Sequence, residues 1–319
     1  MRRIAARAWS RAPLNVVYRH LGWSGKRRFF GAFGQAFQRG SNFPIDPGWW
    51  TIDFAGKTLK LPLVPERMWL DWRLALATLV LDDTVKKTYA AIVSSSLKPD
   101  LFLDVGANYG THSLLFLAHG IRTWSFEPNV RCYPYFIESC GLNAFNPHLE
   151  RVAISRSRGQ ARLHFPEHAT WFGNISDDPG IVGELLAFMS QEENRKDYGC
   201  GFENFKVTDI VEEPVELRTL DDYYGDVIQN ARRILIKIDV EGHELDVLRG
   251  APMTLGRCPL VLFETHNDAA GRGLLFDMLT REEYRIFGLP WSPDGESAAL
   301  ARESFLSDPS ADYLAMRPG

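Results

Sequence analysis

The sequence predicts an α/β protein in which a doubly wound, mostly parallel sheet follows an N-terminal extension made of helices and a hairpin. Two observations predict the sheet. From Leu101 onward short apolar segments alternate with helical patterns, and a glycine-containing turn follows the first of these segments. Such alternation is typical of parallel sheets, because their crossover connections are usually helices. A third observation, the aromatic and basic composition of residues 1–83, distinguishes the extension from the α/β domain at 84–319.

The expected elements follow from the periodicity of apolar residues. Strands are expected at 101–105, 122–126, 150–154, 161–165, 214–218, 233–239, 259–265, 284–287 and 312–317. Helices are expected at 82–97, 110–119, 131–142, 243–249 and 270–281. The segment 171–213 interrupts this alternation, with a polar helix expected near 181–195, and we interpret it as an insertion on the substrate side. In the extension, alternation around Gly56 predicts a hairpin at 51–63.

Composition and charge limit the functional classes. The chain has 319 residues, of which 45% are hydrophobic, and this content is ordinary for a soluble globular protein. Its net charge of -4 gives no reason to expect nucleic acid as a partner, so we predict none. The four cysteines form no CxxC pair, which favours reduced, mostly buried thiols and a cytoplasmic location.

The first 40 residues are basic: they contain nine Lys and Arg residues and no Asp or Glu. No apolar run there reaches the roughly 20 residues of a spanning helix or the length of a signal sequence. The segment resembles a basic surface-binding segment or an organellar transit peptide, so peripheral membrane contact through residues 1–40 is one prediction. The spacing of Phe29, Phe33 and Phe37 predicts a helix near 24–38. This helix is expected to pack in a core or in an interface, which includes a homo-oligomeric interface, or else to contact a membrane.

The stretch LFLDVGANYG at 101–110 predicts a strand that ends in a tight, ligand-binding turn. A dinucleotide site requires G-x-G-x-x-G, but Asn108 replaces the second glycine, and the Gly-Lys-Ser/Thr of a P-loop is absent. Asp104 would repel a pyrophosphate, whereas it suits a ligand with a cationic amino group. These residues therefore favour S-adenosylmethionine over a phosphate ligand.

Acidic residues also end two later strands. Glu127, in FEPN, stands where it can accept hydrogen bonds from both ribose hydroxyls of an adenosyl group. The buried strand within ILIKIDVEGHELDVLRGA brings Asp239 to the carboxyl edge of the sheet, where ligands of open α/β sheets bind. Glu264 and His266, in FETH, are expected at the same edge, and His243 is expected at the start of a helix.

Five motifs in order, DVGANYG, FEPN, TLDD, KIDVEGHELDVLRGA and FETH, resemble the FkbM family of S-adenosylmethionine-dependent methyltransferases. The resemblance covers roughly residues 84–287. It implies a Rossmann-like class I methyltransferase fold and O-methylation, often of saccharides or natural products. It also implies that Asp104, Gly106 and Asn108 shape the cofactor turn, that Glu127 holds the ribose, and that Asp239 lies near the methionyl end. The remaining cofactor-binding candidates are Ala107, Gly110, Pro128 and Ala153.

Methylation of a hydroxyl requires a base or a metal ion, because a neutral hydroxyl is a poor nucleophile. The catalytic candidates are Asp239, His243 and His266, with the two histidines as candidate bases. Alternatively, Asp239, Glu264 and His266 bind a divalent ion such as Mg²⁺. Three other functions stay open: N-methylation on the same fold, a catalytically silent binding module, and a nucleotide-dependent oxidoreductase.

Overall fold

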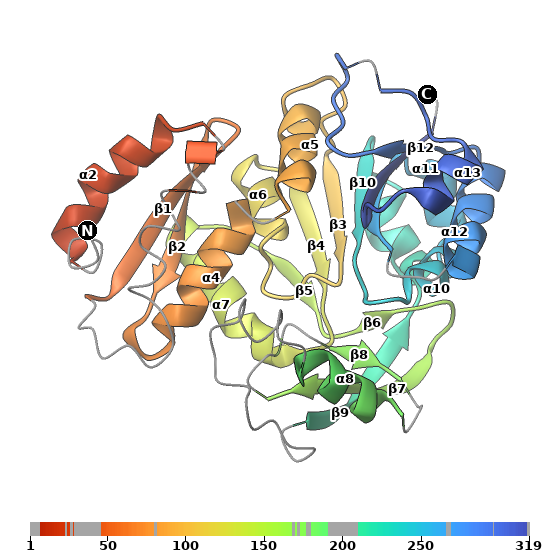
Figure 1. Cartoon of the computed structure of the whole chain (residues 1–319), viewed down its shortest axis with the longest axis horizontal. Helices are drawn as coiled ribbons and strands as arrows, with labels where there is room; N and C mark the ends of the chain where they lie inside the picture. The colour runs from red at the N-terminus through yellow and green to blue at the C-terminus, as the bar shows by residue number, and fades with distance from the viewer. Residues whose placement is uncertain are drawn as a thin grey trace.

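The structure is a computed structural model that describes residues 7–22, 24–25, 28, 46–79, 82–167, 170, 173–176, 180–190, 210–265, 269–295 and 297–317. A central sheet runs through the molecule, with helices on both of its faces (Figure 1). The N-terminal elements lie at one end, and a second, smaller sheet lies below the central sheet in this view.

The central sheet confirms the predicted Rossmann-like class I methyltransferase fold. Its strand order is β12-β13-β11-β10-β3-β4-β5. The strands are β3 (Leu101–Val105), β4 (Arg122–Phe126), β5 (His148–Glu150), β10 (Ile234–Ile238), β11 (Leu260–Glu264), β12 (Arg285–Gly288) and β13 (Asp312–Met316). Neighbouring strands are parallel except at β13, which is antiparallel to both β11 and β12. The parallel strands therefore bring their carboxyl ends to one common edge.

Helices cover both faces of this sheet. They are α5 (Asp83–Val93), α6 (Ser113–Ala118), α7 (Tyr133–Asn143), α10 (Glu244–Arg249), α11 (Pro252–Arg257), α12 (Ala269–Arg281) and α13 (Arg302–Ser307). Short turns of helix complete this part: η3 (Val130–Cys132), η6 (Leu220–Tyr223) and η7 (Tyr224–Ile228). Successive residues of a strand point to opposite faces. Phe102 and Leu235 accordingly belong to one hydrophobic cluster, whereas Leu103 and Ile236 belong to another.

The strands expected at 161–165 and 214–218 form a separate sheet, not part of the central one. This second sheet has the order β6-β9-β7-β8. Its strands are β6 (Ala153–Ile154), β7 (Gly159–Pro166), β8 (Asn174–Ile175) and β9 (Ile210–Arg218). The single strand expected at 150–154 was wrong, because the chain passes from the central sheet at β5 to the second sheet at β6.

The inserted segment is described only in part. Helix α8 (Ile181–Ser190) confirms the helix expected near 181–195 over its first ten residues, and residues 191–209 lie outside the described part. The expectation that this helix is polar was wrong for α8, whose sequence IVGELLAFMS is mostly apolar. The polar residues that suggested it follow Ser190.

The N-terminal extension contains the predicted hairpin. Its elements are α2 (Ala8–Arg19), β1 (Gly48–Phe54), β2 (Lys57–Leu63), η2 (Pro65–Arg67) and α4 (Met68–Leu79). The hairpin turns at Ala55 and Gly56, which both have positive φ, as two-residue hairpin turns of this kind require. The sequence interpretation had not included α2 or α4. Most of the helix expected at 24–38 lies outside the described residues.

Three of the four cysteines are free and buried, as expected, and Cys200 lies outside the described residues. No helix within the described residues is long and apolar enough to cross a bilayer.

Candidate functional site

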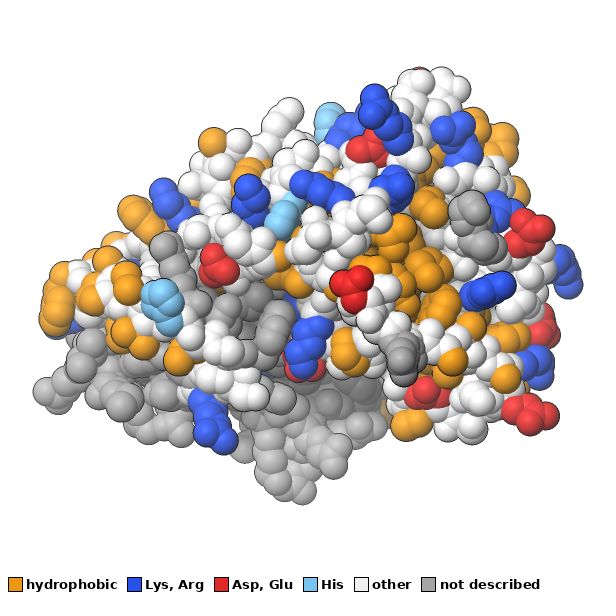
Figure 2. Space-filling view, turned by 90° about the horizontal axis from the view of Figure 1, so that it is seen from above, with side chains coloured by type: hydrophobic (Ala, Val, Ile, Leu, Met, Phe, Trp, Pro, Cys, Tyr) orange, Lys and Arg blue, Asp and Glu red, His pale blue; other side chains and the backbone are white. Residues whose placement is uncertain are grey.

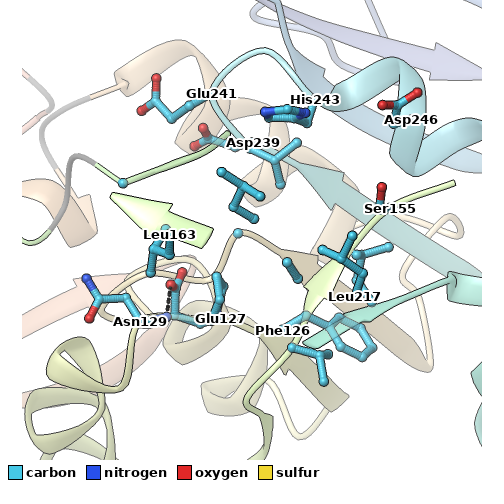
Figure 3. Close-up of a pocket in the computed structure, with 18 of the residues that line it drawn as sticks. Phe126, Glu127, Asn129, Ser155, Leu163, Leu217, Asp239, Glu241, His243 and Asp246 are labelled. Carbon is cyan, nitrogen blue, oxygen red and sulfur yellow. Dashed lines mark hydrogen bonds between the residues drawn. The ribbon is translucent and has the colours of Figure 1, made fainter. Parts of the chain in front are cut away.

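A cavity of about 300 Å³ opens at the carboxyl edge of the central sheet, between this edge and the second sheet. Figure 3 shows that Asp239, Glu241 and His243 lie on one side of the cavity, with Phe126 and Leu217 opposite them. Glu127 and Asn129 lie at the lower left of this view, below Leu163. The cavity therefore has a charged side, a carboxylate on a second wall and an apolar side.

The glycine turn after β3 brings backbone to the cavity. Gly106 has a φ of +79°, and a Cβ atom at this position would lie 1.8 Å from the carbonyl oxygen of Asp239. Only glycine allows β3 and β10 to approach so closely at their carboxyl ends. Asn108, with a φ of +51°, continues the turn and lines the cavity together with Gly106.

Glu127 is fixed by two backbone amides. The N–H of Asn108 donates to its Oε2 at 2.8 Å, and the N–H of Asn129 donates to its Oε1 at 2.7 Å. The residue is only 7% exposed, yet it lines the cavity. Burial raises its pKa to about 7, against the opposing effect of the two amides. A carboxylate oxygen has a second lone pair, so each oxygen of Glu127 can still accept a hydrogen bond from a ligand.

Asp104 lies below the cavity floor, not on its wall. It is fully buried, and Ser113 Oγ donates to its Oδ2 at 2.5 Å. Its Oδ1 has no hydrogen-bond partner among the described residues. Burial raises the pKa of Asp104, an effect that Lys237 on the neighbouring strand opposes. A buried carboxylate oxygen without a partner is costly, and a cationic group on the glycine turn would compensate for it.

Asp239 is held by a buried lysine that sequence reasoning missed. Lys237 Nζ donates to Asp239 Oδ2 at 2.7 Å, and only 4% of Lys237 is exposed. Burial alone would lower the pKa of Lys237, but the negative charges of Asp239 and Asp104 together have the larger effect and raise it. The charged lysine therefore fixes the orientation of Asp239 at the cavity. A lysine within the apolar run ILIKI was the signal available in the sequence.

The turn after Asp239 places a histidine beside it. Glu241 and Gly242 both have positive φ, and His243 precedes the first turn of α10. Glu241 and His243 line the cavity, with Asp246 one turn further along.

Further buried polar groups surround this edge beneath α5. His112 lies between Tyr89, 3.1 Å from its Nδ1, and Lys86, 3.4 Å from its Nε2. Burial, reinforced by Lys86 and Lys237, lowers the pKa of His112 well below its usual value, so the ring is neutral. Burial also raises the pKa of Asp312 on β13 to about 6. None of these four residues was anticipated from the sequence.

Most of the predicted site residues meet at this cavity. Those that line it are Gly106, Asn108, Glu127, Pro128, Ala153, Asp239 and His243. Asp104, Ala107 and Gly110 are not among the lining residues. Gly110 instead faces Phe136, which a Cβ atom would meet at 2.2 Å. His266 lies outside the described residues, so its predicted catalytic role is still a prediction.

The proposed metal ligands do not form a recognisable metal site in the described part of the chain. No group of three or more His, Cys, Asp or Glu side chains there has the arrangement of a metal site. The predicted set consisted of Asp239, Glu264 and His266, and the last of these is not described.

Besides the predicted Ala153 on β6, further residues of the second sheet line the cavity, and the sequence does not point to them. Leu163 on β7, Ile175 on β8 and Leu217 on β9 contribute to the wall. Thr170 ties this sheet to the cofactor turn, because Asn129 Nδ2 donates to its carbonyl oxygen at 3.0 Å and its hydroxyl group hydrogen-bonds to Tyr109. No motif marks these residues, since they meet only through the folding of the second sheet.

Known proteins resemble this chain in sequence. Methyltransferase sdnD of Sordaria araneosa is 31% identical over 157 residues, which is 46% of this chain and 59% of that protein. The AMB antimetabolite synthetase AmbE of Pseudomonas aeruginosa is 27% identical over 212 residues, which is 60% of this chain and 10% of that protein. The chain thus spans less than two thirds of either relative.

Solved structures resemble it more distantly. The 16S rRNA N2 G1207 methyltransferase RsmC of T. Thermophilus aligns with 99% of this chain and 71% of its own, at 11% identity and a TM-score of 0.38. The ribosomal protein L11 methylase of Lactobacillus delbrueckii subsp. bulgaricus aligns with 74% of this chain and 79% of its own, at 13% identity and a TM-score of 0.34.

The family assignment comes from the sequence match at the site itself. Residues 104–286 match the family described as methyltransferase FkbM domain. This range begins at Asp104 and includes the glycine turn, Glu127 and Asp239, and it covers more than half of the chain. The chain belongs to the FkbM methyltransferase family.

Proposed function

We propose that this protein is an S-adenosylmethionine-dependent methyltransferase that methylates a hydroxyl group of a small molecule, such as a saccharide or a natural product. The observation that carries the proposal is the position of Glu127. It is a buried carboxylate that two backbone amides orient beside a glycine turn, and it borders a cavity. Family membership supports methyl transfer. On the opposite side of the cavity, His243 can accept a proton and Asp239 can accept a hydrogen bond, which supports a hydroxyl oxygen as the methyl acceptor.

The residues around the cavity fit S-adenosylmethionine. Glu127 would accept hydrogen bonds from the ribose hydroxyls, and the apolar side with Phe126 and Leu217 would hold the adenine. Gly106 lets β3 and β10 approach closely beside the methionyl part, and the negative charge of Asp104, buried two residues before Gly106, suits a cationic amino group. The methyl donor would then face Asp239 and His243.

Asp239 and His243 supply what an acceptor hydroxyl requires. Bound S-adenosylmethionine provides an electrophilic methyl group on a sulfonium. His243 would accept the proton that the hydroxyl loses, and Asp239, fixed by Lys237, would orient the acceptor through a hydrogen bond. An amine acceptor would need no such base, so the base at this position favours O-methylation over N-methylation. A divalent ion at Asp239, Glu264 and His266 is still a prediction, which chelation during turnover would test.

The first test is an isothermal titration of the protein with S-adenosylmethionine, beside Glu127→Ala. We expect the variant to bind more weakly by about 1 to 3 kcal/mol, because it loses two hydrogen bonds to the ribose. NAD serves as the control ligand and should not bind, because the turn lacks the pyrophosphate glycines. A folded wild-type protein that does not bind S-adenosylmethionine would contradict the proposal.

The same titration should depend on pH. The raised pKa of Glu127, about 7, means that the carboxyl group is protonated below neutrality and cannot accept from both hydroxyls. Binding should therefore strengthen as the pH rises from about 6 to about 8, whereas Glu127→Ala should lose this dependence. In the unliganded protein, the effect of pH on stability runs in the opposite direction to its effect on binding. The stability contribution of Glu127 is fully present below the unfolded pKa and is lost as the pH rises through about 7.

A further inference from the structure

Helix α2 buries several polar side chains and exposes several apolar ones, although Leu14 packs against the core. Ser10, Arg11 and Asn15 are at most 5% exposed. In contrast, Trp9 is 75% exposed, Val16 is 55% exposed and Val17 is 54% exposed. The outward residues, with the exposed Pro13, follow the spacing i, i+4, i+7, i+8, which places them on one face of a helix. This arrangement is the reverse of an ordinary surface helix.

Polar contacts fix α2 in this orientation. The backbone N–H of Ala8 donates to Asp46 Oδ2 at 3.0 Å, and Arg7 forms an ion pair with the same carboxylate at 3.3 Å. On the inner face, the Arg11 guanidinium donates to the carbonyl oxygens of Asp46 and Pro47. Rotating α2 to bury its apolar face would break these contacts and leave Arg11 without its carbonyl partners. The outward apolar face is therefore a stable feature of this fold.

The apolar face extends beyond α2. Trp49, on the adjoining strand β1, is 47% exposed, and Lys60 Nζ lies 5.3 Å from the centroid of its ring. Figure 2 shows hydrophobic side chains gathered at the left end of the molecule, where α2 lies (Figure 1). We define the outer apolar face as Trp9, Pro13, Val16 and Val17. Tryptophan favours the boundary between water and lipid, where its ring is apolar and its N–H remains solvated.

We propose that the outer apolar face of α2 docks on the surface of an anionic lipid bilayer. The charge of the surrounding sequence supports this occupant: residues 1–40 contain nine Lys and Arg residues and no Asp or Glu, and seven of the nine remain when Arg7, paired with Asp46, and the buried Arg11 are set aside. Anionic lipid headgroups attract such a segment, while the apolar face inserts at the boundary with the acyl chains. The site cavity lies in another part of the molecule, so the membrane contact leaves it open.

A second copy of the chain is the competing occupant, and charge argues against it. A twofold interface brings the same surface of both copies together. A homodimer through this face would bring together two copies of a chain whose basic segment 1–40 contains no acidic side chain. An anionic bilayer neutralises this charge, whereas a homodimer through the outer apolar face concentrates it.

Co-sedimentation of the full-length protein with vesicles tests the proposal. One set of vesicles contains phosphatidylcholine and phosphatidylglycerol in equal parts, and the other contains phosphatidylcholine alone. We expect the protein to pellet with the anionic vesicles and to do so about tenfold less with the neutral ones. Trp9→Ser and the double variant Val16→Ser/Val17→Ser should each reduce binding to anionic vesicles by about tenfold, which corresponds to about 1.4 kcal/mol.

Ile137→Ser is the matched control, because Ile137 on α7 is 56% exposed and lies outside the outer apolar face. It should bind vesicles as the wild type does, and all variants should bind S-adenosylmethionine unchanged, which shows that they are folded. Absence of vesicle binding, or binding that the α2 variants leave unchanged, would overturn the proposal. So would light scattering that shows a wild-type dimer which Trp9→Ser dissociates, because a second copy would then cover this face.

Discussion

Gly106 shows at the scale of one residue why the turn after β3 needs glycine. Its φ of +79° is unfavourable for a residue with a side chain, and its position against the Asp239 carbonyl leaves no space for a Cβ atom. Gly56, in the hairpin turn, has the same φ of +79° but no atom within 4 Å of an added Cβ. A side chain at either position would therefore strain the backbone, but only at Gly106 would it also clash with a neighbouring atom.

This difference gives a prediction with its own control. Gly56→Ala should lower the free energy of unfolding by about 1 to 2 kcal/mol, the cost of a left-handed conformation. Gly106→Ala should lower it further and weaken S-adenosylmethionine binding at least tenfold, since β3 and β10 must separate at the cavity. Urea unfolding and calorimetric titration measure both effects. Equal behaviour of the two variants would show that the close approach of β3 and β10 has no functional consequence.

At the scale of an element, the second sheet forms one wall of the cavity. Leu217 and Val215 on β9 both pack in the small hydrophobic cluster of the second sheet, but of the two only Leu217 lines the cavity. Thr170 links the same sheet to the cofactor turn. The second sheet therefore forms part of the proposed cofactor site.

We predict that Leu217→Ala weakens S-adenosylmethionine binding by about 1 kcal/mol, or roughly fivefold, because an apolar contact with the adenine is lost. Val215→Ala should reduce stability but leave the dissociation constant unchanged. Titrations of both variants, with thermal unfolding as the stability measurement, separate the two effects. If Leu217→Ala binds as tightly as the wild type, the adenine lies elsewhere in the cavity.

At the scale of the whole molecule, the N-terminal hairpin and the methyltransferase sheet share one hydrophobic cluster. Trp50 and Leu61 of the hairpin belong to the same cluster as Phe102 and Phe116. Asn143, at the end of α7, joins them further: its Nδ2 donates to the Lys60 carbonyl at 2.7 Å, and its Oδ1 accepts from the Lys60 N–H at 2.8 Å. These contacts connect the two parts of the chain through a common core.

A fragment consisting of residues 84–319 should therefore be unstable. Removing the extension would expose the apolar side of α6 and α7, and we expect aggregation or the loss of cooperative unfolding. The full-length chain should unfold in a single transition by calorimetry. A soluble, cooperative fragment that binds S-adenosylmethionine with unchanged affinity would show instead that residues 1–83 form an independent unit.

Much of the central sheet and of the cofactor turn was predictable. The strands at Leu101–Val105 and Arg122–Phe126 are short apolar segments with clear ends, and Asp104 near the end of the first and Glu127 after the second mark the carboxyl edge. The second sheet was not predictable, because nothing local shows that the chain leaves the central sheet after Glu150. Helix α2 was not anticipated, and the inward direction of Arg11 follows only from its contacts with residues 46 and 47.

The sequence by itself determined the fold class and the glycine turn. It also indicated Glu127, Asp239 and His243 as candidate site residues, because spacing and residue type in consecutive segments carry that information. Only the tertiary structure decided what surrounds these residues. It placed Lys237 against Asp239, left one oxygen of the buried Asp104 without a hydrogen-bond partner among the described residues, and brought Leu163, Ile175 and Leu217 to the cavity. Side chains far apart in sequence meet through packing between elements, and no local pattern encodes that packing.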